Sequence, residues 1–372
     1  MRVVLVHDWL FHMRGGEKVL EAISELFPDA PIYTLFYDSR QVSPFLKGRQ
    51  LHGTILQALP GIRRYYRWLL PFLPAIVKTI KLPPSDLVIS TSHCVAKAVR
   101  VPAGAVHISY CHTPMRYIWG FGEDYFKKIP FFVQPLLNWF TSCLRRWDIS
   151  QNKSVDHFIA NSDNVRKRIE TFYHREAAVI HPPVDADYFK PVAPKENFYF
   201  IVSAFVPYKR LDIVIQAFNK LDRQLLIVGS GPMEAEYKKM RTSEKIMFLG
   251  GVPDSQLRIL LSQARAVLFP TDEDFGIVPL EAQACGTPVI AFRKGGALES
   301  VKSGLFFDAQ TPEAVIAAVQ EFESQPRNSP ETVSSLVQNF SRPNFKIKFL
   351  NFITEHSPVK TPDENQAIKA LS

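Results

Sequence analysis

The feature that most constrains the fold is a repeated alternation of short apolar runs and amphipathic helical patterns. In the first half, runs such as VVLV (3–6) and VHISYC (106–111) alternate with stretches of helical periodicity. A second series begins with FYFIVS (198–203) and continues through AVLFP (266–270). Such alternation is typical of parallel sheets that carry helices on both faces. The sequence therefore predicts an α/β protein made of two Rossmann-like halves.

The boundary between the halves is expected in HPPVDADYFKPVAPKEN, residues 181–197, which holds four prolines and shows no helical periodicity. At 372 residues the chain is also longer than a single hydrophobic core usually grows. We predict an N-terminal domain over 1–185 and a C-terminal domain over 190–340. A helix over 343–356 is expected to pack back on the first domain, followed by a polar, mobile tail over 357–372.

The composition is that of a soluble globular protein, with 46% apolar and 22% charged residues. The four cysteines have no short paired spacing, which argues against a zinc knuckle or a disulfide framework. The first apolar run has only four residues before His7 and Asp8, too short for a signal peptide. These features predict a cytoplasmic protein.

Positive charge is concentrated between Lys47 and Arg100, where nine Lys or Arg face a single acidic residue, Asp86. Within this region the basic residues alternate with large apolar ones, as in RRYYRWLLPFL (63–73). The mixture favours an acidic membrane surface over a nucleic acid as the anionic partner. A core helix with a solvated basic face is the alternative, and the sequence leaves both open. The uncharged run 129–144 predicts a buried or interfacial helix rather than a membrane span.

Two glutamates mark the stretch TDEDFGIVPLEAQACGTPVIAF, residues 271–292, which follows a predicted strand. Helix N-termini at the carboxyl ends of parallel strands are common ligand sites. Gly276 permits close approach to the backbone, and Pro279 falls in the first helical turn. Glu273 then lies at the strand tip and Glu281 about one turn into the helix. Their separation predicts two contacts to one extended ligand rather than a pair that shares a proton.

The stretch EDFGIVPLEAQACGTPVIA resembles the E-x7-E region of the retaining glycosyltransferase family 4, whose members have the GT-B fold of two Rossmann-like domains facing a central cleft. Further motifs follow in the order of that family: RGGEKVL, YCHTPMRYIW, IANSDNVRKRI, VIHPPVD, VSAFVPYKRLDIVIQAF, IVGSGP, FLGGV and GGALESV. The motifs HDWL and CHTPMRYIW are similar to those of bacterial O-antigen and exopolysaccharide mannosyltransferases.

The resemblance implies transfer of a hexose, with mannose from GDP-mannose as the expected donor, to a polyprenyl-diphosphate-linked glycan in bacterial surface polysaccharide biosynthesis. The C-terminal half would bind the nucleotide sugar and the N-terminal half the acceptor. The enzyme would lie on the inner face of the cytoplasmic membrane, docked through residues 60–82. The resemblance implies neither a cofactor nor a metal ion.

The resemblance also implies roles for particular residues. Glu273 would hold hydroxyls of the transferred sugar, helped by the N–H groups of Phe275 and Gly276. Glu281 would accept hydrogen bonds from the ribose, since a carboxylate is acceptor-only. Fixed cations stabilise the charge that develops on a leaving diphosphate, a role for Lys209 and Arg210. The chain departs from the commoner family pattern at one position, because Ala204 stands where an arginine is usual.

His112 matches the active-site histidine that contacts the donor sugar in the family. A flexible backbone cradle is expected at the glycines before EKVL, an acceptor contact after the CHTP motif, and a nucleobase border at the later glycines. The remaining substrate-binding candidates are Gly15, Gly16, Arg116, Gly229, Gly231, Gly250, Val252 and Ile277.

Each of these features also has a structural reading. The glutamates could be exposed residues at a helix start, Lys209 and Arg210 a solvated helix start, and His112 a structural histidine. Two other functions also use such folds: a sugar-nucleotide epimerase, and a nucleotide-sugar-binding protein without catalysis, for which Ala204 is the argument. They differ in outcome, because an epimerase rearranges the donor and a binding protein leaves it unchanged.

Overall fold

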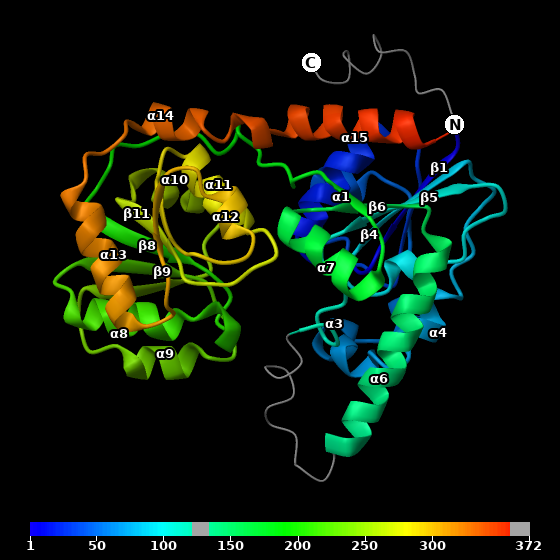
Figure 1. Cartoon of the computed structure of the whole chain (residues 1–372), viewed down its shortest axis with the longest axis horizontal. Helices are drawn as coiled ribbons and strands as arrows, with labels where there is room; N and C mark the ends of the chain where they lie inside the picture. Colours follow the sequence, from blue (N-terminus) through cyan, green and yellow to red (C-terminus); the bar gives the residue numbers. More distant parts are fainter. Residues whose placement is uncertain (121–133, 358–372) are drawn as a thin grey trace. The chain divides into compact units, whose positions relative to one another are not determined.

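The computed structural model describes residues 1–120 and 134–357, which divide into two compact units (Figure 1). Unit 1 comprises residues 1–183 together with the segment from Pro343 onward, and unit 2 comprises residues 184–342. The first division falls inside the proline-rich stretch 181–197. Of the tail expected over 357–372, all but the first residue lies outside the described residues.

Unit 1 is built on a seven-stranded parallel sheet with the strand order β3-β2-β1-β4-β5-β6-β7. The strand order reverses beside β1, so its carboxyl end and that of β4 meet at one edge of the sheet. The strands are β1 (Val3–His7), β2 (Ile32–Thr34), β3 (Leu51–His52), β4 (Leu87–Ser92), β5 (Val106–Cys111), β6 (His157–Ala160) and β7 (Ala177–Val179). The helices are α1 (Gly15–Leu26), α2 (Pro44–Lys47), α3 (Ile62–Tyr65), α4 (Leu73–Val77), α6 (Gln134–Ser150), α7 (Asp163–Tyr173) and α15 (Arg342–His356), with short 3-10 turns η1 (Ile55–Ala58), η2 (Tyr66–Leu69), η3 (Ala96–Ala98) and η5 (Gln151–Ser154).

Alternate residues of the unit 1 strands enter two different cores, as the period of a strand requires. Val3 and Leu5 pack with α1 and with three residues of α15, namely Phe345, Phe349 and Ile353. Val4 and Val6 pack on the opposite face, against the segment of α3 and α4 and against Leu144 of α6. The C-terminal helix is therefore part of the unit 1 core.

Residues 60–82 form a chain of short turns, α3, η2 and α4, instead of one continuous helix. Pro71 and Pro74 interrupt the segment, because proline cannot donate to the preceding turn. One side of the segment is buried in the unit 1 core, while Trp68 is 83% and Phe72 61% exposed. One side of the segment thus belongs to the core, and contact of its exposed aromatic side chains with a membrane stays a prediction.

The uncharged run 129–144 is only partly described, since residues 129–133 lie outside the described residues. From Gln134 onward it forms the first part of α6, in which Leu136 and Trp139 are exposed and Leu144 is buried. The buried alternative is wrong for this exposed part, and the interfacial alternative stays a prediction. Within 1–120 and 134–357 no helix has both the length and the apolar character needed to cross a bilayer.

Unit 2 is a six-stranded parallel sheet with the order β10-β9-β8-β11-β12-β13. The order reverses between β8 and β11, which places the carboxyl ends of these two strands side by side. The strands are β8 (Phe198–Val202), β9 (Gln224–Val228), β10 (Ile246–Gly250), β11 (Ala266–Phe269), β12 (Val289–Phe292) and β13 (Gly304–Phe307). The helices are α8 (Leu211–Lys220), α9 (Glu234–Met240), α10 (Asp254–Gln263), α11 (Ile277–Ala284), α12 (Ala297–Ser300), α13 (Pro312–Ser324) and α14 (Pro330–Ser335), with 3-10 turns η6 (Pro207–Lys209) and η7 (Gln338–Phe340).

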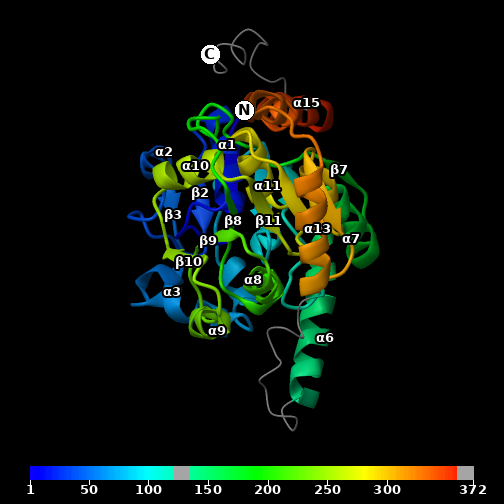
Figure 2. The same ribbon diagram turned by 90° about the vertical axis from the view of Figure 1, so that its left-hand side faces the viewer.

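Helices cover both faces of this sheet (Figures 1 and 2). One face buries Tyr199 and Ile201 against α8, α9 and α13. The other buries Phe198 and Phe200 against α10, α11 and α12. The expected Rossmann-like organisation is confirmed for each unit: parallel strands buried on both faces, with loops at their carboxyl ends that are free to hold a ligand.

Candidate functional site

Two of the predicted site residues meet at the carboxyl edge of the unit 2 sheet. Lys209 ends the 3-10 turn that follows β8, and Glu273 lies in the loop after β11. The Lys209 ammonium forms an ion pair with Oε1 of Glu273, and both side chains are largely buried. The two loops are also joined by Thr271, whose Oγ1 donates to the carbonyl oxygen of Lys209 at 3.1 Å. Because the ends of β8 and β11 are neighbours, residues 209 and 273, which lie 64 positions apart in the sequence, form one ion pair.

Two glycines that sequence reasoning did not select support the Glu273 loop. The N–H of Gly296 donates to the carbonyl oxygen of Glu273 at 2.8 Å. A Cβ on Gly296 would meet Cα of Phe275 at 2.1 Å, and one on Gly295 would meet the Glu273 carbonyl oxygen at 2.4 Å. The loop can therefore take this position only because residues 295 and 296 lack side chains. The pair of glycines in the motif GGALESV was the available signal.

The helix α11 starts directly after this loop. Gly276, at its N-cap, has φ +84°, and a Cβ there would meet the Phe269 ring at 2.9 Å. Its N-cap residue has no side chain that could cap the first turn, and the positive end of the helix dipole favours an anion or a hydroxyl at this place. Pro279 is the third helical residue, where its missing N–H costs nothing. Glu281, one turn into the helix, is only 5% exposed. A buried carboxylate at this place differs from an exposed helix-start glutamate.

Arg210 does not extend toward Glu273 as Lys209 does. It adopts a left-handed conformation with φ 53° at the N-cap of α8. Its guanidinium donates to the Asp212 carboxylate at 3.1 Å and to Oε1 and the carbonyl oxygen of Gln310 at 3.3 Å. Arg210 is therefore not a solvated cation at a helix start, because its side chain is held by α8 and the segment before α13, and its role toward a diphosphate stays a prediction.

The two glycines after β9 stand where the structure has no room for a side chain. A Cβ on Gly229 would meet the Ser203 carbonyl oxygen at 1.8 Å, and one on Gly231 would meet that of Phe205 at 2.5 Å. The Gly229 N–H donates to the Gly250 carbonyl oxygen at 2.8 Å. The Gly229 N–H is therefore already bonded within the sheet edge, and the place of Gly229 beside a nucleobase stays a prediction.

The remaining candidates of unit 2 lie in two environments: one borders open space, and the others pack against the core. Gly250 has φ +70° beside a register shift in β10, and a Cβ there would meet nothing within 4 Å. Val252 and Ile277 are partly buried, and both pack against the core that contains the buried Phe275. Gly250 thus borders open space next to β9, whereas Val252 and Ile277 pack against the core.

In unit 1 the structure brings His112 together with the start of α1. His112 follows β5, and its Nε2 atom is 3.4 Å from the position that a Cβ on Gly16 would occupy. Nε2 is buried and has no hydrogen-bond partner within the described residues. Burial, together with the nearby His93 and His7, lowers the pKa of His112 well below 6.5, so the imidazole is neutral. A neutral ring with an unsatisfied nitrogen is suited to bind a hydroxyl.

Gly15 and Gly16 form the first turn of α1 rather than a flexible loop, which corrects the expected cradle. A capping box between Arg14 and Glu17 fixes this turn, with Arg14 N–H donating to Glu17 at 3.1 Å. Arg116, four residues after His112, is half-buried in the turn that follows β5. The residues that sequence reasoning assigned to unit 1 therefore lie after β5 and at the N-terminus of α1.

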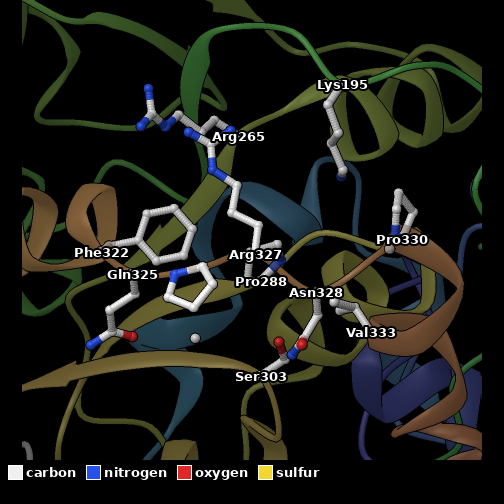
Figure 3. A pocket seen from close by; sticks show the side chains of 13 residues that line it. Lys195, Arg265, Pro288, Ser303, Phe322, Gln325, Arg327, Asn328, Pro330 and Val333 are labelled. Atoms are coloured by element: carbon white, nitrogen blue, oxygen red, sulfur yellow. The ribbon is translucent and has the colours of Figure 1, made fainter.

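Unit 2 also contains a pocket that none of the candidate residues lines. It has a volume of about 140 Å³ and is lined by Lys195, Arg265 and Arg327, among others (Figure 3). Pro288 and Ser303, which also line it, directly precede β12 and β13, so this pocket lies at the amino edge of the sheet. Glu273 follows β11 at the opposite, carboxyl edge. Across residues 1–120 and 134–357, no group of three or more His, Cys, Asp or Glu side chains is arranged to hold a metal ion.

Two family models match the chain and together span most of it. Residues 13–188 match the model described as Glycosyltransferase Family 4, and residues 185–339 match Glycosyl transferases group 1. Among curated proteins, the D-inositol 3-phosphate glycosyltransferase of Mycobacterium avium is 31% identical over 176 residues, covering 41% of this chain and 42% of the relative. That of Mycobacterium tuberculosis is 30% identical over 41% of the chain and 37% of the relative. The matching region thus spans less than half of these relatives.

Solved structures resemble nearly the whole chain. HepE of Anabaena in complex with UDP superimposes with a TM-score of 0.69 at 17% identity, over 95% of this chain and 100% of that one. Sucrose-phosphate synthase from Thermosynechococcus elongatus gives a TM-score of 0.70 at 18% identity, over 95% and 99%. At such low identity these likenesses establish the fold, which is GT-B.

Proposed function

This chain belongs to the GT-B glycosyltransferases with family 4 and group 1 domains, and from that premise we propose that it transfers a hexose from a nucleotide sugar to a hydroxyl acceptor with retention of configuration. Unit 2 supplies the donor-binding residues and unit 1 those that face the acceptor. The observation that carries the proposal is the Lys209–Glu273 ion pair at the carboxyl edge of the unit 2 sheet, directly before the uncapped helix α11.

The geometry supports a division of labour within unit 2. The N–H groups at the start of α11 and the Lys209 ammonium are fixed positive groups, which stabilise the charge that grows on a departing diphosphate. Glu273 accepts hydrogen bonds from hydroxyls of the transferred sugar, and its ion pair with Lys209 holds it in place. The buried Glu281 accepts hydrogen bonds from the ribose. Ala204 leaves the diphosphate with one cation fewer than the usual pattern, and Arg210 would have to leave Asp212 to replace it.

No pair of carboxylates in this arrangement is set up for double displacement. Glu273 pairs with a lysine, and Glu281 lies eight residues further along, buried in α11. We therefore propose front-face transfer: the new bond to the acceptor oxygen forms as the sugar–diphosphate bond breaks, and the leaving phosphate takes the proton. In this scheme His112, neutral and with an open nitrogen, holds a sugar hydroxyl instead of acting as an acid.

For the donor we propose GDP-mannose, which rests on the HDWL and CHTPMRYIW motifs. The solved neighbours direct attention to uridine nucleotides as well, since one of them was crystallised with UDP and with UDP-glucose. The acceptor we propose is a polyprenyl-diphosphate-linked glycan at the inner face of the cytoplasmic membrane. The curated relatives are described as acting on inositol 3-phosphate, so a phosphorylated polyol is the alternative acceptor to include.

Membrane contact is proposed through residues 60–82. Trp68 and Phe72 are exposed on this segment, and Arg63, Arg64 and Arg67 lie on the same turns. Aromatic side chains next to cations are the combination that binds an anionic lipid surface. Trp68→Ala with Phe72→Ala should weaken binding to phosphatidylglycerol vesicles. Leu336→Ala, which removes an exposed apolar side chain from unit 2, is the control. Equal binding of the two variants would contradict the contact.

Calorimetric titration of the purified chain with GDP-mannose, UDP-glucose and UDP-N-acetylglucosamine, followed by slow hydrolysis of whichever binds, tests the donor. Binding of a uridine donor with no response to GDP-mannose would overturn the mannosyl proposal while leaving transfer intact. Conversion of the donor into its epimer would favour the epimerase. Tight binding without hydrolysis or transfer would favour a binding protein.

A further inference from the structure

A cluster of three histidines lies at the carboxyl ends of β1, β4 and β5 in unit 1, and the proposed function uses only one of them. His7 ends β1, His93 follows β4, and His112 follows β5. The ring centroids of His7 and His93 are 6.1 Å apart, and those of His93 and His112 are 6.4 Å apart. His93 thus lies between the other two, next to the residue that was predicted to touch the sugar.

Asp8 holds both the backbone and the ring of His93. The Asp8 carboxylate is fully buried and accepts four backbone N–H groups, those of residues 93 to 96, at 2.7 to 2.9 Å. Its Oδ2 also lies 3.2 Å from Nδ1 of His93. Five donors converge on this one carboxylate and hold the loop after β4 in a single conformation. Because Nδ1 faces a carboxylate, its proton stays there and Nε2 is left as a bare acceptor.

The orientation of the His93 ring is defined on a second side by Trp9. The two rings meet edge to face with centroids 4.6 Å apart, and Trp9 is itself buried in the unit 1 core. His93 is the open member of the cluster, with 28% of its side chain exposed, whereas His7 is almost fully buried. No described residue partners Nε2 of His93.

The two neighbours are unsatisfied as well. Nε2 of His7 and Nε2 of His112 are both buried without a hydrogen-bond partner within the described residues. A buried polar nitrogen without a partner costs free energy, which a ligand hydroxyl can offset. Three imidazoles, each with a nitrogen that no described residue partners, thus gather at one end of the sheet, and burial keeps two of them neutral, which suits a polyhydroxy compound better than an anion.

We propose that the Asp8–His93 dyad binds the acceptor: Nε2 of His93 accepts a hydrogen bond from a hydroxyl of the acceptor sugar, beside His112. This inference rests on the proposed transfer function and deepens it, by naming a residue that selects the acceptor. His93 touches substrate in this scheme, while Asp8 is a positioning residue that sets its tautomer. The acceptor proton still leaves with the phosphate, so no further base is required.

Two substitutions test the roles of the two ring nitrogens of His93 separately. His93→Asn keeps an N–H near Asp8 but removes the acceptor at the Nε2 position, while His93→Gln places its terminal amide near that position. We expect His93→Asn to lower kcat/KM for the acceptor by about tenfold or more, the value of one lost hydrogen bond to an oriented group, and His93→Gln to recover part of it. His52→Asn, at an exposed histidine of unit 1, is the matched control and should be silent.

Donor hydrolysis without acceptor distinguishes this inference from the proposed function. If wild-type protein neither binds nor hydrolyses a nucleotide sugar, the transfer function itself fails. If His93→Asn hydrolyses donor at the wild-type rate with an unchanged acceptor KM and an unchanged melting temperature, only the role of His93 is overturned.

A comparison of the acceptor KM with the donor KM gives a readout that a structural role would not move. His93→Asn should raise the acceptor KM and leave the donor KM at its wild-type value. Equal changes in both constants would contradict the proposal.

Discussion

Lys209 and Glu273 form a largely buried ion pair that joins the loop after β8 to the loop after β11. The pair lies where the strand order of the unit 2 sheet reverses, which is the usual ligand-binding edge of an open parallel sheet. Each partner would leave an uncompensated charge if the other were removed, so both are expected to matter for the same step.

Glu273→Gln should lower the turnover of transfer by about 10²- to 10³-fold, a loss typical of one oriented polar group in an active site. Lys209→Met should act in the same direction, and the double variant should lose less than the product of the two, because the residues act as a unit. Steady-state kinetics of the four proteins measure this. Glu313→Gln, which breaks the exposed pair with Lys220, is the control and should keep wild-type rates.

Glu281→Gln should act mainly on donor affinity. The buried carboxylate is proposed to accept hydrogen bonds from the ribose in both ground and transition state. Its replacement should raise donor KM by about 10- to 100-fold with a small change in kcat, since interactions of that kind contribute uniform binding. A large drop in kcat at saturating donor, with KM unchanged, would assign Glu281 to the chemistry instead.

Gly229→Ala is predicted to destabilise unit 2 because its Cβ would lie 1.8 Å from the Ser203 carbonyl oxygen, at φ +138°. The free energy of unfolding should fall by more than about 3 kcal/mol, as urea denaturation would measure. Gly251→Ala is the matched control, since nothing lies within 4 Å of a Cβ there. The control should stay within about 0.5 kcal/mol of wild type. Similar stability of both variants would contradict the close packing of β9 against the loop after β8.

Unit 1 is predicted to lose stability in mild acid. Burial lowers the pKa of His7 from 6.5 to about 4. Between pH 6.5 and pH 4, His7 therefore binds a proton in the unfolded chain but not in the folded one. The stabilising contribution is complete above pH 6.5 and is lost as the pH falls toward 4, up to about 3 kcal/mol. His107, whose pKa burial also lowers to about 4, acts in the same direction. Melting temperatures that stay constant between pH 7 and 4.5 would contradict this.

The positions of most strands and helices were predictable from the sequence, and the errors have physical reasons. Runs such as FYFIVS and AVLFP became β8 and β11 because central strands are apolar on both faces. The strands β2, β3, β7 and β13 escaped prediction, because the first three have only two or three residues each and the last is a glycine followed by three apolar residues at a sheet edge. The segment 60–82 carried an apolar and basic pattern, but its prolines break it into short turns.

The candidate site was predictable where its residues lie in one motif and not where distant segments meet. Glu273, Gly276 and Glu281 share a strand–loop–helix unit whose spacing is readable from the chain. The engagement of Arg210 depends on Gln310, 100 residues away, and the support of Glu273 by Gly296 depends on how β12 leads into α12. His93 carried no pattern of its own, and only the fold places it between His7 and His112.

The central claim is transfer of a hexose with retention, and ¹H NMR of one reaction mixture tests it most directly. The purified chain would be followed with a nucleotide sugar and a lipid-linked or soluble polyol acceptor, with Glu273→Gln as the inactive reference. We predict a new anomeric signal with the configuration of the donor sugar and stoichiometric release of nucleoside diphosphate, both absent in Glu273→Gln. A product of inverted configuration, or an unchanged donor with every nucleotide sugar and acceptor tried, would contradict the account.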